Sequence, residues 1–164
     1  MKLHVIFALG ALIASTGCQS SSGGTRGAAP NPLLLQPAIN SVPASGLVPQ
    51  NLDPGECGLF LWSQTDTSKF IFFSRALSGE AVFAQGEEPM ILAQATAGGE
   101  IFGQFTTRMG YLSPDGRSID LSFEPDEVLQ DGQRLRNGLL TITDPEGWLT
   151  KLPVLGVRAC QPEG

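Results

Sequence analysis

The chain has 164 residues, enough for one small domain with additional segments, and it carries sixteen Asp and Glu against ten Lys and Arg. This net charge of −6 opposes binding to DNA, RNA or anionic lipid headgroups, and it favours a cationic protein partner. With one histidine and three cysteines, the chain has few residues for metal or thiol chemistry.

The first 17 residues have the parts of an export signal. Lys2 supplies a positive charge, and an uncharged apolar run follows at residues 5–14. This run is shorter than the about 20 apolar residues that a membrane-spanning helix requires. Small residues then lead into a cysteine in the sequence STGC, residues 15–18. The pattern predicts a signal peptide over residues 1–17 that is removed from the mature chain.

This order of residues resembles the lipobox of bacterial lipoproteins. The resemblance implies that Cys18 becomes the lipid-modified amino terminus, and that several acyl chains anchor the protein stably to a membrane. Ser15 departs from the family pattern, which usually has Leu there. Gln19 stands where an Asp would imply retention at the inner membrane, so the resemblance implies an outer-membrane protein facing the periplasm. The alternatives are an ordinary cleaved signal peptide and a chance apolar terminus.

Residues 18–55 are rich in Pro, Gly and Ser and predict a disordered linker. Only Arg26 and Asp53 are charged, and the segment lacks a periodic apolar face that would offset the entropy of ordering it. Leu33-Leu34-Leu35 is its one apolar cluster. These leucines are either a docking segment for the domain or a partner, or scattered apolar residues of a tether.

Residues 56–164 form the expected domain, with one cysteine near each end. Once Cys18 is lipidated, Cys57 and Cys160 remain, and two such thiols in an exported chain usually form a disulfide. Two buried free thiols are the alternative. No CxxC motif is present, so neither zinc binding nor thiol-redox chemistry is indicated.

The domain has the sequence pattern of short strands. Ile119, Leu121 and Phe123 alternate with polar residues, as in a strand with one buried face. Apolar runs separated by Gly, Pro, Asn and Asp turn signals predict further strands at 57–62, 69–73, 80–85, 90–97, 101–112, 139–143 and 148–160. About eight short strands predict an all-β domain, an antiparallel barrel or a sandwich. Residues 125–135 alone have a pattern that allows one or two helical turns.

The mature chain has few groups for catalysis, because its only histidine, His4, lies in the signal peptide. This excludes a Ser-His-Asp triad, a Cys-His pair, a histidine base and His-ligated zinc. No phosphate-binding glycine loop is present either. We therefore expect no catalytic residue, no metal and no cofactor.

An acidic cluster and one tryptophan are the expected partner surface. The cluster consists of Glu124, Asp126, Glu127 and Asp131. A calcium loop or a pair of glycosidase carboxylates is a weaker interpretation, since the spacing of a calcium loop is not met. Trp148 follows a turn and is expected at a rim of the domain.

The sequence thus predicts a membrane-anchored lipoprotein that presents a small, non-catalytic binding or envelope-assembly domain. Removal of the signal peptide leaves a net charge of −7. The alternative is a lipoprotein inhibitor of a lysozyme or a protease, which depends on architecture and charge alone.

Overall fold

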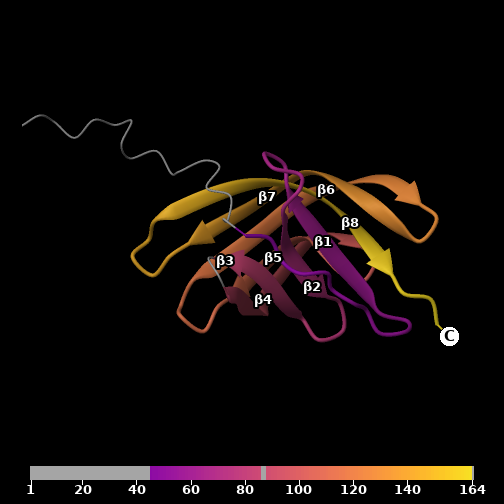
Figure 1. Cartoon of the computed structure of the whole chain (residues 1–164), viewed down its shortest axis with the longest axis horizontal. Coiled ribbons are helices and arrows are strands. Elements are labelled where there is room, and N and C mark those ends of the chain that lie inside the picture. The colour runs from indigo at the N-terminus through magenta and orange to yellow at the C-terminus, as the bar shows by residue number, and fades with distance from the viewer. Residues whose placement is uncertain (1–44, 86–87, 164) are drawn as a thin grey trace, which may run out of the picture. The chain divides into compact units, whose positions relative to one another are not determined.

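The computed structural model describes residues 45–85 and 88–163, in which eight strands form a closed antiparallel barrel (Figure 1). Cys18, the signal peptide and Leu33–Leu35 lie outside the described residues. Each strand pairs with the next in the sequence, and β1 pairs with β8. The strands are β1 Cys57–Ser63, β2 Phe70–Arg75, β3 Glu80–Gln85, β4 Glu88–Phe102, β5 Phe105–Leu112, β6 Ser118–Leu129, β7 Gly132–Thr143 and β8 Leu149–Cys160.

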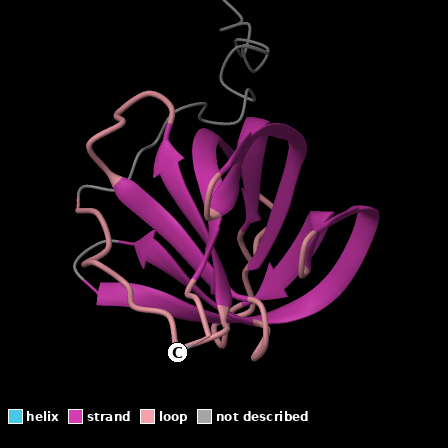
Figure 2. Cartoon of the chain, turned by 90° about the vertical axis from the view of Figure 1, so that its right-hand side faces the viewer, coloured by secondary structure: helices cyan, strands magenta, loops and turns pink. Residues whose placement is uncertain are grey.

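The all-β prediction is confirmed, and the barrel rather than the sandwich is the architecture. Strands and loops make up the described chain, as Figure 2 shows. Closure comes from a ladder that joins Cys57 to Cys160 at one end and Ser63 to Val154 at the other. The strands β1 and β8, purple and yellow in Figure 1, therefore lie side by side although they come from opposite ends of the domain.

Residues 125–135, which the sequence allows to be helical, instead extend a hairpin. Strand β6 continues to Leu129, β7 begins at Gly132, and these two residues pair across the turn. Register shifts interrupt the ladder between Ser122 and Glu124 and between Pro125 and Val128. The helical interpretation was wrong because β7 continues pairing along β8 here, and a partner strand overrides a weak local preference.

Alternating side chains from all eight strands fill the barrel. Leu59 and Leu61 of β1 are fully buried, as are Ile119 and Leu121 of β6. Tyr111 lies among them, and its hydroxyl donates to Ser74 Oγ at 3.1 Å. In residues 118–123 this alternation of buried and exposed residues is the pattern on which the strand prediction rested.

A disulfide joins Cys57 to Cys160, as the cysteine positions predicted. The two residues lie 103 apart in the sequence and are direct neighbours in the β1–β8 ladder. The covalent bond therefore holds the closing seam of the barrel at the end where the chain enters β1 and leaves β8.

The described chain begins before the expected domain boundary at residue 56. Residues 45–55 run beside β1 and β2, where Leu47 packs against the core and Leu52 lies over Gly58, and we call them the strap. Leu47 N donates to Phe70 O at 2.6 Å. Gly58 approaches Leu52 so closely that a Cβ there would collide with its side chain. Phe73, whose ring lies beside that of Phe60 outside the central core, is only 1% exposed.

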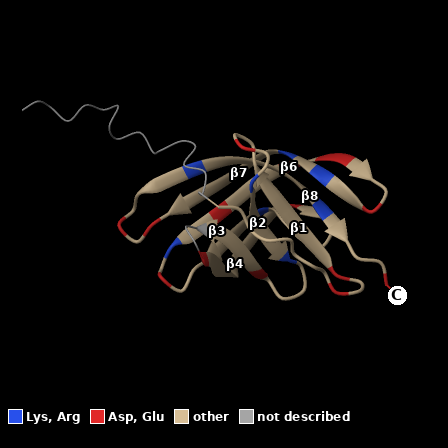
Figure 3. Ribbon diagram, in the orientation of Figure 1, with Lys and Arg blue, Asp and Glu red and all other residues tan. Residues whose placement is uncertain are grey.

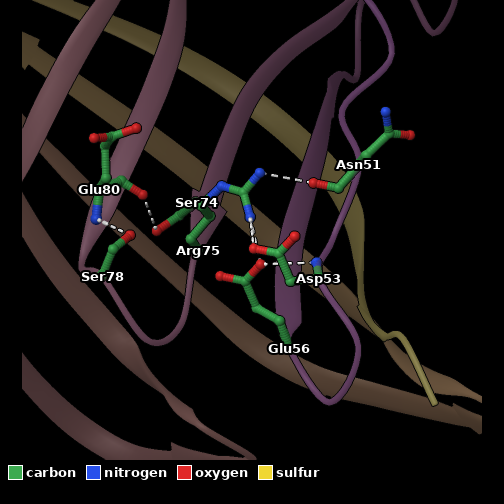
Figure 4. Close-up of polar contacts among 7 residues, drawn as sticks. All are labelled: Asn51, Asp53, Glu56, Ser74, Arg75, Ser78 and Glu80. Carbon is green, nitrogen blue, oxygen red and sulfur yellow. Dashed lines mark hydrogen bonds and ion pairs between the residues drawn. The ribbon is translucent and has the colours of Figure 1, made fainter. Parts of the chain in front are cut away.

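A polar cluster holds the strap to β2 (Figure 4). The Arg75 guanidinium donates to the Glu56 carboxylate, and its other terminal nitrogen donates to Asn51 O at 2.8 Å. Glu56 also accepts from Asp53 N at 3.2 Å, and only 5% of its side chain is exposed. The guanidinium lies 5.5 Å from the centre of the Phe73 ring. One arginine thus links the strap, the start of β1 and the end of β2.

We predict that Glu56→Gln lowers the free energy of unfolding by about 2 kcal/mol, because it leaves Arg75 without its buried counter-charge. Asp53→Asn is the matched control. The Asp53 side chain is 89% exposed and lies 3.9 Å from the guanidinium, so its loss should cost less than about 0.5 kcal/mol. Urea denaturation measures both. Equal effects of the two substitutions would contradict this role of Glu56.

We also predict that the double variant Cys57→Ser/Cys160→Ser keeps its β-sheet circular dichroism spectrum but loses about 2–4 kcal/mol of unfolding free energy. The ladder between β1 and β8 remains, while the unfolded chain gains the freedom that the bond removed. Reduction of the wild-type protein should give the same loss in urea denaturation. A double variant as stable as the oxidised protein would show that the bond does not secure the seam.

Candidate interaction surface

The predicted acidic cluster lies on the β6–β7 hairpin, where basic residues of β7 partly neutralise it. Glu124 pairs with Arg136 at 3.2 Å and accepts from Asn137 Nδ2 at 3.1 Å. Glu127 pairs with Arg134 at 3.3 Å. These pairs follow from the strand structure, because the extension of β7 brings its arginines beside β6. The hairpin is therefore a surface of mixed charge rather than a purely acidic loop.

Trp148, which the sequence predicts at a rim, lies in an exposed turn and does not join the acidic cluster. It is 63% exposed in the turn between β7 and β8, whereas Asp131 lies in the turn between β6 and β7. Strand β7 separates these turns by 12 residues, or about 40 Å at 3.3 Å per residue. Acidic residues occur in the turns at both of its ends (Figure 3). The expected partner residues thus lie in two separate areas of the surface.

Few ionisable groups in the described chain have shifted pKa values. Burial raises the pKa of the Tyr111 phenol to about 12. Hydrogen bonds from the hydroxyls of Ser68 and Ser113 hold the pKa values of Asp66 and Asp115 below their ordinary range. Both aspartates lie in exposed turns, and neither these shifts nor that of Tyr111 adjusts a proton donor or acceptor to neutral pH. Among the described residues, no group of three His, Cys, Asp or Glu side chains is arranged to hold a metal ion.

One cation points into the barrel at the disulfide end. The Arg158 guanidinium lies 5.4 Å from the centre of the Phe102 ring and contacts the turn at Gly103. Gly103 has a φ of 65°, and a side chain there would occupy the space of the guanidinium. Phe102 in turn contacts Phe123 edge-on, with ring centres 5.0 Å apart. The β4–β5 turn and Arg158 therefore cover this end of the core.

The outer wall of the barrel carries a groove across β3, β4 and β5. Ile91 and Leu112, which line it, are 59% and 50% exposed. Their strands lie side by side, because Ala93 pairs with Glu80 on one side and with Leu112 on the other. The hollow has a volume of about 530 Å³, and we call it the Ile91–Leu112 groove. Its lining residues are Ser78, Gly79, Glu80, Ile91, Leu92, Ala93, Gln94, Leu112, Ser113 and Pro114.

Glu80 supplies the charge of this groove. Its backbone is held by two serines, since its N–H donates to Ser78 Oγ at 3.2 Å and its carbonyl accepts from Ser74 Oγ at 3.4 Å. Its carboxylate points away from Arg75 (Figure 4), and it forms no ion pair within the described residues. The groove thus combines two exposed aliphatic side chains with an uncompensated carboxylate.

No pattern in the sequence indicated this groove. The run from Met90 to Leu92 marks a strand but does not show which residue faces outward, and Ile91 proves to be the exposed one. Two smaller hollows, of about 410 and 250 Å³, lie further along the outer wall and share Arg108 and Ser122. Glu124, one of the predicted partner residues, lines the larger one.

Comparison with known proteins gives no match among protein-family models, curated proteins or solved structures. The part of the chain that the structure describes holds no apolar helix of bilayer-spanning length. The surface itself is therefore the basis for the functional argument.

Proposed function

We propose that this chain is a lipid-anchored, non-catalytic binding module of a bacterial cell envelope. Its Ile91–Leu112 groove binds a protein segment that carries apolar and positively charged side chains. The observation that carries the proposal is the groove itself, where two exposed aliphatic side chains lie beside the unpaired carboxylate of Glu80.

The apolar part of the groove supports binding. A large aliphatic side chain that is half exposed leaves apolar surface in water, and covering that surface is favourable. Ile91 and Leu112 line one hollow rather than standing alone, and Leu77, 75% exposed, directly precedes the lining residue Ser78. The volume of the hollow, about 530 Å³, lies within the range of ligand clefts on proteins.

The charge of the groove supports a cationic partner. Glu80 is the one charged residue among those that line it, and the mature chain has an expected net charge of −7. A negative field accelerates the encounter with a positive partner, and Glu80 would pair with a Lys or Arg of the bound segment. A nucleic acid lacks this complementarity.

The chemistry of the described residues supports a non-catalytic role. The mature chain is expected to have no histidine, and a buried group with a strongly shifted pKa among residues 45–85 and 88–163 is the Tyr111 phenol, in the core. The Glu124 and Glu127 carboxylates are occupied by arginines. A binding role therefore explains the groove, and no catalytic reaction is needed to explain it.

The anchor is inferred from the amino-terminal sequence. Lipidation at Cys18 and the Gln that follows it favour the outer membrane, with the barrel in the periplasm. The 27 residues from Cys18 to the first described residue, Ser45, would span about 30 Å as a flexible coil. Such a tether lets the barrel move near the membrane while its groove meets a partner.

We predict that Cys18→Ser abolishes incorporation of a palmitate analogue and leaves unprocessed or soluble protein, because the attachment atom is gone. Metabolic labelling followed by fractionation of membranes measures this. Cys57→Ser/Cys160→Ser is the control and should keep its label. Equal labelling of Cys18→Ser and the wild type would overturn the anchor.

We predict that a photo-reactive amino acid at Gln94, which lines the groove, cross-links in the cell envelope to one predominant protein. The cross-linked segment should contain Lys or Arg among apolar residues. Leu112→Asp and Glu80→Lys should each reduce the yield about tenfold or more, because they remove the apolar contact or reverse the charge.

The control for this experiment is the same photo-reactive residue at Lys151, which is exposed on β8. Leu155→Asp, a charge at an apolar residue of β8 that is 37% exposed, is the matched control substitution. Cross-linking that survives both groove substitutions, or that is equal from Lys151, would contradict the proposal. Capture of a cationic lysozyme or protease would identify the module as an inhibitor.

A further inference from the structure

We propose that the Leu33-Leu34-Leu35 segment of this same chain occupies the Ile91–Leu112 groove when no partner is bound. The inference deepens the proposed function, since it concerns the same groove, and it rests on that function for the identity of the competing partner. It joins two observations that are otherwise unexplained. These are an apolar cluster in a polar tether and an uncovered apolar groove on the barrel.

The described chain begins close enough to the groove. Leu47 N donates to Phe70 O, so the strap enters beside the start of β2. Across the sheet, Phe72 of β2 pairs with Phe83 of β3, and Phe83 pairs with Met90 of β4. Two strand spacings of about 4.8 Å therefore separate β2 from the strand that carries the groove. Ile91 directly follows Met90 in that strand.

The intervening chain is long enough to reach it. Ten residues lead from Leu35 to Ser45, and in an extended chain they span up to about 33 Å. The groove residues Ile91–Gln94 also lie three to six residues, or about 10–20 Å, further along the strands than Phe70. Together with the about 10 Å between β2 and β4, this gives a path of about 22 Å at most, which the segment still spans. The leucines can therefore lie over β4 and β5 without displacing the strap.

The segment has suitable chemistry for an apolar groove. Three leucines stand in the sequence PLLLQP, which contains no charge, between Pro32 and Pro37. Each proline restricts its own backbone and favours an extended residue before it, which reduces the entropy lost on docking. An extended apolar tripeptide can cover Ile91 and Leu112 as partner peptides cover aromatic or aliphatic grooves on other domains.

The tether makes even weak docking effective. A segment joined by a short flexible linker has an effective concentration in the millimolar range, so it is half docked when its intrinsic affinity is also only millimolar. The leucines leave Glu80 unpaired, whereas a cationic partner would pair with it. The partner therefore has an advantage that the tether lacks, and it displaces the leucines. Docking would thus keep the apolar side chains of the groove covered until a cationic partner displaces the leucines.

A second apolar area on the barrel is a poorer site for the leucines. Phe60, Trp62 and Phe70 lie outside the core on β1 and β2, but their rings already contact one another at 5.1 to 5.9 Å. Each of them is partly covered. Ile91 and Leu112 are more exposed and line a hollow, so docking there removes more apolar surface from water.

The test is a disulfide trap in the full-length, lipid-anchored protein within its own envelope. Gln36→Cys lies next to the leucines, and Gln94→Cys lies in the groove lining, so all apolar contacts are kept. We expect an intramolecular 36–94 bond, identified by non-reducing peptide mass spectrometry. Its yield should exceed that of the control pair Gln36→Cys/Lys151→Cys about fivefold, the advantage that docking adds to tethering alone.

A third variant separates docking from mere proximity. Leu33→Ser/Leu34→Ser/Leu35→Ser in the trapped protein should lower the yield of the 36–94 bond to the control level. Equal yields from the two cysteine pairs, or a yield that the serines leave unchanged, would overturn the inference. A 36–94 bond formed between two molecules would also overturn it and would place a second copy in the groove.

The same variants distinguish this inference from the proposed function. In the photo-cross-linking experiment, the three serines should increase the capture of the partner at Gln94, because they remove its competitor. If the 36–94 disulfide forms in a protein that captures no partner, the result would support the docked tether and contradict the partner site. If no 36–94 disulfide forms and the three serines leave partner capture unchanged, the result would support the partner site and contradict the docked tether.

Discussion

Hydrogen bonding between β1 and β8 leaves this sheet without an edge. The seven pairs from Cys57–Cys160 to Ser63–Val154 are the most non-local contacts of the barrel, because they join the two ends of the domain. Without them, two apolar strands would expose unpaired backbone groups and invite association. The disulfide secures the same seam, so the closure has both covalent and hydrogen-bonded support. The filled core, the strap and the outer groove all depend on this closure.

Closure also directs where binding can occur. Buried aromatic and aliphatic side chains fill the inner face, and the β4–β5 turn with Arg158 covers the disulfide end. Side chains of the outer wall are then the ones available to a partner. There the strap covers one part, over β1 and β2, while the Ile91–Leu112 groove on β3, β4 and β5 stays open in the described chain.

The strap links this architecture to the proposed anchor. Leu47 is hydrogen-bonded to Phe70, and Arg75 joins Asn51 and Glu56 to the end of β2, so residues 45–56 are fixed to the barrel at two places. The barrel is thereby held at a defined point beside β2. That point lies two strands from the groove, which is the basis of the docking proposed for Leu33–Leu35.

The sequence by itself determined the features that are encoded by local pattern. Alternation in residues 118–123 predicted a strand, turn residues predicted the reversals, and two cysteines at the domain ends predicted their bond. These signals are local or depend on simple counting, and the structure confirms them. Alternation does not reveal which strands meet, however, so barrel and sandwich both stayed open until the β1–β8 ladder was seen.

Tertiary structure decided the strap, the hairpin and the groove. Residues 125–135 became strand because β6, β7 and β8 pair there, and residues 45–55 gained order from Arg75 and Phe70, which lie far along the chain. Ile91 and Leu112 are 21 positions apart, and only the pairing of β4 with β5 makes them one surface. The pairing of β3 with β4 placed Glu80 beside them, and the length of β7 left Trp148 far from the acidic hairpin. A binding surface depends on which strands become neighbours, and that choice is a property of the whole folded sheet.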